Sequence, residues 1–124
     1  MNTKDRENLL KDLCARIPYG VKCQCLGRIG TVRSIDTFGN TEVESSSGSV
    51  VTDVTNVKPY LFPLSSMTRE QRREYVQIAN KCGTIASSQL AGMTIQDWFD
   101  KNYLDYRDFI SKGWAENATG LNIY

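Results

Sequence analysis

Val21-Lys22-Cys23-Gln24-Cys25 is the stretch that decides the fold. Apolar and polar residues alternate along it, which is typical of a strand with one buried face. A second strand, Arg28–Asp36, follows and is rich in Ile, Val and Thr. Its alternation breaks once, and Gly30 at the break predicts a β-bulge.

Further short strands are predicted at 41–45, 50–54 and 57–60, with hairpin tips at 38–40 and 46–48. Four or five short antiparallel strands within about 40 residues cannot bury both faces of a flat sheet. The sequence therefore predicts a small SH3-like antiparallel β-barrel over residues 19–60.

Residues 4–17 predict an amphipathic helix that Asn2 or Thr3 can cap and that Pro18 ends. Its expected buried stripe is Leu9, Leu10, Leu13, Cys14 and Ile17. The whole chain, 1–124, then forms one α+β domain: the 4–17 helix, the 19–60 barrel and a helical part over 61–124.

The helical part should contain two to three helices. Thr68 and Gln71 form a capping box that opens a helix to about Cys82, and Gly83 is its expected end. A second helix should begin at Thr94, and a short one over 106–112 should be capped by Asp105. The expected buried face of the first is Tyr75, Val76, Ile78, Ala79 and Cys82. Residues 84–93 and 114–124 show no clear period.

Charge and hydropathy limit the partners. Among 124 residues, fifteen Lys and Arg face fourteen Asp and Glu, a net charge of +1, which argues against binding nucleic acid through bulk charge. No apolar run is long enough to cross a membrane. The amino terminus lacks the apolar core of a secretory leader, so we expect a cytoplasmic protein without membrane contact.

The residues supply little for catalysis. The chain contains no histidine, and Cys14, Cys23, Cys25 and Cys82 do not have the spacing of a zinc site. We expect Cys23 and Cys25 to be small buried hydrophobes. We expect no catalytic residue and no cofactor. An acidic run offers a metal-dependent enzyme only as a third hypothesis, against helix caps and a solvated face: Asp97, Asp100, Asp105 and Asp108.

Nucleic-acid binding is an alternative. Gly27-Arg28-Ile29-Gly30-Thr31-Val32 is similar to the opening of small barrels in ribosomal and transcription factors, and a basic helix follows at 69–73. The residues that would contact phosphates are Arg28, Arg33, Arg69, Arg72 and Arg73. Acidic residues interleave with them, which weakens this hypothesis.

Protein contacts are the remaining possibility. Aromatic residues that flank proline or charged positions suit an interface, and the extended segment between Pro59 and Pro63 could also pair two copies as a homodimer. The interface candidates are Tyr19, Tyr60, Phe62, Tyr106 and Arg107. We expect the hairpin tips to set partner specificity.

Several segments carry a resemblance to a known group. They are 13–20 (LCARIPYG), 58–68 (KPYLFPLSSMT) and Asp105-Tyr106-Arg107 with Gly113 behind it. The chain resembles a family of small proteins of unknown function in gut Bacteroidetes genomes, often within prophage-like or mobile regions. The resemblance implies an intracellular protein of phage or mobile-element origin and assigns no activity. The leading hypothesis is a non-enzymatic protein-binding or adaptor module with an unidentified protein partner.

Overall fold

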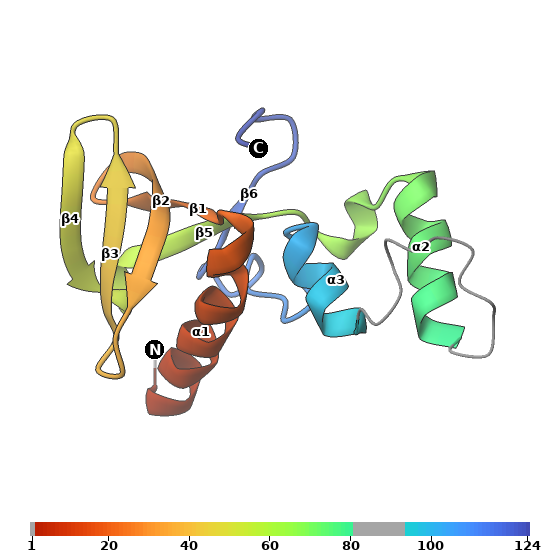
Figure 1. The fold of residues 1–124 in the computed structure, drawn as a ribbon, viewed down its shortest axis with the longest axis horizontal. Helices are drawn as coiled ribbons and strands as arrows, with labels where there is room; N and C mark the ends of the chain where they lie inside the picture. The colour runs from red at the N-terminus through yellow and green to blue at the C-terminus, as the bar shows by residue number, and fades with distance from the viewer. Residues whose placement is uncertain (1, 81–93) are drawn as a thin grey trace.

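The computed structural model describes residues 2–80 and 94–124 and shows an α+β chain with one six-stranded sheet (Figure 1). The α-helices are α1 (Thr3–Arg16), α2 (Arg69–Asn80) and α3 (Ile95–Lys101). The strands are β1 (Lys22–Cys25), β2 (Arg28–Ile35), β3 (Asn40–Ser45), β4 (Gly48–Asp53), β5 (Val57–Leu61) and β6 (Glu116–Asn117). Short 3-10 turns cover Ile17–Tyr19, Val54–Asn56 and Leu64–Ser66. None of the described helices has the length and apolar composition that a membrane crossing requires.

The sheet has the order β4-β3-β2-β1-β5-β6. Strands β1 to β4 form an antiparallel meander, β5 returns to pair antiparallel with β1, and β6 adds parallel to β5. The five strands predicted between residues 21 and 60 are confirmed to within two residues at each end. The sheet is not closed, because β4 and β6 are its two edges and do not pair with each other.

Helix α1 forms where the sequence predicts it and packs on the sheet, with its buried stripe turned by about one position. Asn2 caps it by accepting the N–H of Asp5 at 2.8 Å. The residues that are buried lie at i, i+3, i+4 and i+7: Leu9, Asp12, Leu13 and Arg16. Cys14, predicted to be buried, is exposed, because Asp12 and Arg16 occupy the places that an apolar stripe through Cys14 would have filled.

The bulge predicted at Gly30 is wrong. The irregularity in β2 lies between Val32 and Ser34, where the pairing register with β3 shifts. Gly30 is required by close packing instead. A Cβ at this position would lie 2.6 Å from Cγ1 of Val43 and 2.9 Å from the carbonyl oxygen of Glu44.

Helices α2 and α3 begin where the sequence predicts. Thr68 and Gln71 form the capping box, with hydrogen bonds of 3.0 and 3.1 Å, and Thr94 accepts the N–H of Asp97 at 3.1 Å. The buried face expected for α2 is only partly correct. Ile78 is buried, but Tyr75 and Val76 are 36% and 51% exposed, because α2 lies at the far end of the molecule from β2–β4 (Figure 1).

Four expectations at the end of α2 lie outside the described residues. They are the burial of the Ala79 side chain, the burial of Cys82, the helix end at Gly83 and the conformation of 84–93.

The helix predicted over 106–112 is wrong. Asp105 does cap this segment, since its carboxylate accepts the N–H groups of Phe109 and Ile110 at 2.8 and 2.9 Å. The chain nevertheless forms successive turns, because Asp108 adopts a left-handed φ of 60° that interrupts a helix. The tail that showed no period, 114–124, contributes β6.

Two apolar cores hold these elements together. The larger lies between α1 and the sheet and contains Leu9, Leu13, Val21, Cys23, Cys25, Val32, Val43, Val54, Val57, Leu61, Phe109 and Ala115. The smaller joins α2 and α3 around Ile78, Trp98 and Leu104. No residue of β4 belongs to the larger core, and residues 48–51 of this edge strand are exposed.

We predict that Gly30→Ala destabilises the protein by about 1–3 kcal/mol, because the added methyl group overpacks the β2–β3 contact. The measurement is the free energy of unfolding by denaturant. Ser34→Ala, at an exposed position of the same strand, is the matched control and should change stability by less than about 0.5 kcal/mol. Equal stability of Gly30→Ala and the wild type would contradict this packing argument.

Candidate functional site

The two sides of the five-stranded unit β4-β3-β2-β1-β5 differ: the outer side of β5 is covered, and that of β4 is open. The outer edge of β5 is covered by the C-terminal segment: Ala118 donates its N–H to the Leu61 carbonyl at 2.8 Å, and Phe62 donates to the Tyr103 carbonyl at 2.8 Å. No strand among the described residues pairs with the outer side of β4. Residues 48–52 carry no charge, and Val50 and Val51 are 40% and 65% exposed. The charged residue of β4, Asp53, lies at its end and is paired with Arg6. An exposed edge segment without charges is a template for pairing with another chain.

The register of the hairpin shows which groups β4 presents. Val54 donates its N–H to the Gly39 carbonyl at 2.8 Å, which marks this pair, next to the ends of β4 and β3, as a hydrogen-bonded pair. Bonded positions recur every second residue in an antiparallel pair, so Thr52 and Val50 face β3. Ser49 and Val51 therefore point their N–H and C=O groups toward the open edge.

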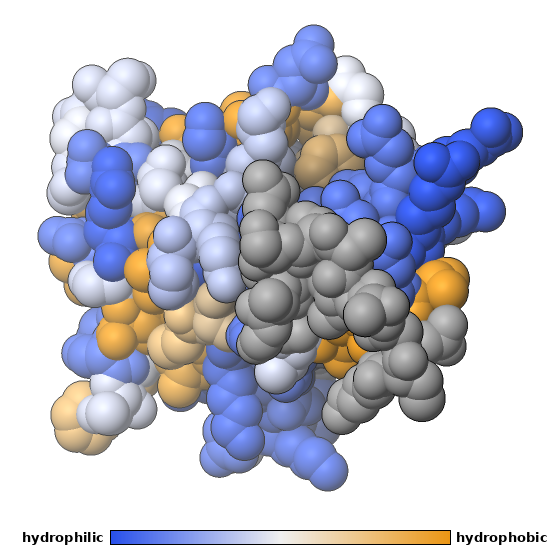
Figure 2. All heavy atoms as spheres, turned by 45° about the vertical axis from the view of Figure 1, so that its right-hand side comes forward, coloured by the Kyte–Doolittle hydropathy of each residue, from blue (hydrophilic) through white to orange (hydrophobic). Residues whose placement is uncertain are grey.

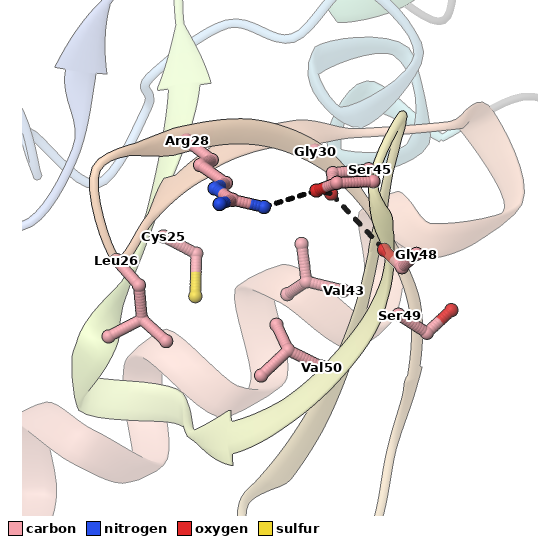
Figure 3. Close-up of a pocket in the computed structure, with 10 residues that line it drawn as sticks. Cys25, Leu26, Arg28, Gly30, Val43, Ser45, Gly48, Ser49 and Val50 are labelled. Carbon is pink, nitrogen blue, oxygen red and sulfur yellow. Dashed lines mark hydrogen bonds between the residues drawn. The ribbon is translucent and has the colours of Figure 1, made fainter.

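A cavity of about 300 Å³ lies beside this edge (Figure 3). Cys25, from the end of β1, and Val43 and Val50, from paired positions of β3 and β4, point into it. Leu26 stands at its mouth, 67% exposed. This volume lies at the lower end of the range for ligand pockets. The cavity therefore offers an apolar floor next to unpaired main-chain groups.

The rim of the cavity is polar. Arg28, the first residue of β2, donates a hydrogen bond to the hydroxyl of Ser47 in the β3–β4 turn. The Ser45 hydroxyl donates to the Gly48 carbonyl at 3.1 Å and lies 3.1 Å from the Ser47 hydroxyl. One predicted hairpin tip, 46–48, thus belongs to this site. The other, 38–40, lies at the opposite end of the sheet and exposes Phe38 (Figure 1).

Cys23 and Cys25 have the packing role that the sequence predicts, and Cys14 does not. Cys23 and Cys25 are buried, whereas Cys14 is exposed on α1, and Cys82 lies outside the described residues. Burial, with a smaller contribution from Cys25, raises the pKa of the Cys23 thiol to about 12. Burial raises the pKa of Cys25 as well. Both remain thiols at neutral pH, which makes them poor nucleophiles and poor metal ligands.

The five arginines suggested for nucleic acid are not gathered on one face. Arg28 and Arg33 belong to β2, while the other three lie on α2 at the far end of the molecule (Figure 1). Arg33 is paired with Glu44 at 2.9 Å. The separated group is Arg69, Arg72 and Arg73. Figure 2 shows strongly hydrophilic side chains at the upper right and a hydrophobic patch directly below them. No shared phosphate-binding surface results from this arrangement.

The aromatic interface candidates are largely used within the fold. Tyr60 is only 6% exposed, and Phe62 is half-buried in the core between α2 and α3. The half-buried ring of Tyr106 stacks on Phe99, with ring centroids 5.1 Å apart. The other two candidates connect the N-terminal and C-terminal parts of the chain. The Tyr19 carbonyl accepts a hydrogen bond from the Tyr103 hydroxyl, and Arg107 pairs with Asp12 at 3.3 Å.

The acidic run does not form a metal site in the described residues. Asp97 and Asp108 are exposed, and no group of three potential ligands is gathered in residues 2–80 and 94–124. Asp105 caps the turns that follow it. Asp100 is buried with its Oδ1 atom 3.7 Å from Nε of Arg16 and without a hydrogen-bond partner.

The sequence alone does not identify the β4 edge or the cavity. It predicts the strand and its serine-rich turn, but the order of strands in a sheet is not contained in the local pattern of any one strand. The available signal was the run from Ser45 to Thr52, eight residues without a charge between Glu44 and Asp53. Edge strands are commonly protected by charges, so an uncharged edge is informative once the order is known.

Comparisons of the chain with models of known protein families, with curated proteins and with solved structures find no match.

We predict that Asp100 lowers stability as pH rises from about 4 to about 6. Burial raises its pKa from 3.8 to about 6, with Arg16 opposing the rise. Across this range the unfolded chain loses a proton that the folded chain keeps, so folding becomes less favourable. The free energy of unfolding of Asp100→Asn, measured relative to that of the wild type, should therefore be higher at pH 7 than at pH 4 by up to about 3 kcal/mol. The measurement is unfolding by denaturant at several pH values, and a difference that stays constant with pH would contradict the prediction.

Proposed function

We propose that this protein is a non-enzymatic binding module that takes an extended segment of a partner protein as an additional strand on β4. The observation that carries the proposal is the open edge of β4, which presents the main-chain groups of Ser49 and Val51 beside an apolar cavity. Main-chain hydrogen bonds supply affinity in strand addition, and pockets for alternate side chains supply specificity. An extended segment would pair its main chain with Ser49 and Val51 and place a side chain in the apolar cavity.

The same proposal includes an SH3-like barrel opened at β4. Three features support it: the order β4-β3-β2-β1-β5, the 3-10 turn Val54–Asn56 between β4 and β5, and the pairing of β5 with β1. Closure would require the edge of β4 to be covered. A bound segment would cover that edge.

The resemblance to small proteins of Bacteroidetes mobile regions supports placing such a module in a phage or mobile-element setting within the cytoplasm. A partner protein from the same setting would supply the extended segment. This part of the proposal rests on the resemblance carried by residues 13–20, residues 58–68 and Asp105-Tyr106-Arg107 with Gly113 behind it.

We predict that Val51→Pro weakens binding of extended peptides at least about tenfold, because proline removes an N–H from the open edge and its ring obstructs the incoming strand. Val51→Thr, which keeps the N–H group and the β-branch, should bind as the wild type does. The peptides come from a library of random decapeptides, each placed within a linker on the yeast surface. Those that bind the wild-type protein are selected from it. Thermal unfolding of both variants checks that they fold.

Two results would contradict the proposal. One is a library from which no peptide is enriched, or whose enriched peptides bind Val51→Pro as tightly as the wild type. The other is a concentration-dependent dimer that Val51→Pro abolishes, since β4 would then pair with a second copy. Sedimentation of the free protein measures the second.

A further inference from the structure

Arg28 distinguishes the rim of the cavity from the rest of the sheet. It is exposed and donates to the Ser47 hydroxyl, and no carboxylate in residues 2–80 and 94–124 lies within ion-pair distance of it. The other arginine of β2, Arg33, is already paired with Glu44. Glu44 is the acidic residue next to the hairpin tip at 46–48, and its carboxylate pairs with Arg33 and not with Arg28.

The surroundings of Arg28 suit a carboxylate. A guanidinium donates two parallel hydrogen bonds to a carboxylate, and such charge-assisted bonds are stronger than neutral ones. The bond to Ser47 holds Arg28 at the rim, beside the apolar floor formed by Cys25, Val43 and Val50. The cavity and Arg28 therefore present an apolar and a cationic contact to the same stretch of an incoming strand.

We infer that the strand added to β4 carries an apolar side chain that enters the cavity and, within about two residues of it, an Asp or Glu side chain that pairs with Arg28. This inference rests on the proposed function. The charge of Arg28 favours an acidic segment over a neutral or basic one. The edge residues 48–52 are neutral, and Arg28 is the charged residue that lines the cavity.

The test pairs protein variants with peptide variants. Peptides enriched from the linker-embedded library have no free carboxyl terminus, so any enriched acid is a side chain. Each is then synthesised with an amidated end, once with its acidic residue and once with Asn or Gln instead. Arg28→Gln should weaken the acidic peptide about tenfold and the neutral one less than about twofold. Arg33→Gln, on the same strand, should change neither.

The possible outcomes separate the two claims. If Val51→Pro abolishes binding but Arg28→Gln affects acidic and neutral peptides equally, or the library selects no acidic residue, strand addition stands and the acidic partner is wrong. If no peptide binds, both proposals fail together. A selective loss with Arg28→Gln that diminishes as salt concentration rises supports the inference.

Discussion

The buried side chain of Arg16 joins the first helix to the last third of the chain. It donates to the carboxylate of Asp12 at 2.9 and 3.1 Å and to the carbonyl of Leu104 at 2.7 Å, and it also lies near Asp100. A buried charge without its partners is strongly unfavourable, so these groups must be assembled whenever the chain folds. Arg107 reinforces the cluster from outside by pairing with Asp12.

The placement of this cluster explains why the outer side of β5 is covered and that of β4 is open. By holding Leu104 against α1, Arg16 fixes the segment that runs beside β5, where Leu104 bridges to Phe62 and β6 pairs with Tyr60 and Leu61. The C-terminal segment is therefore committed to β5 and does not reach β4. The β4 edge stays open, and the cavity and Arg28 lie beside the β3–β4 turn that leads into it.

Local patterns in the sequence predicted the elements well and their neighbours poorly. Alternation identified β1, and the capping box at Thr68 located α2 within one residue. The burial of Asp12 and Arg16 could not be predicted from the helix pattern, which places charged residues in solvent. The groups that cover this pair, at residues 100–107, are distant in the sequence. The open edge at β4 was missed for the same physical reason: which strand lies outermost depends on long-range pairing. Cys25 was predicted to be buried, but its position in a cavity wall depends on the β3–β4 turn, which a strand pattern does not place.

The most direct test of strand addition at β4 is where a bound peptide lies. The measurement is a set of nuclear Overhauser contacts between an isotope-labelled protein and an unlabelled peptide selected from the library. Strand addition predicts contacts from the backbone protons of Ser49 and Val51 to successive peptide residues, in the regular pattern of paired strands. Contacts confined to α2, or to the face of the sheet that carries Arg33, would contradict it.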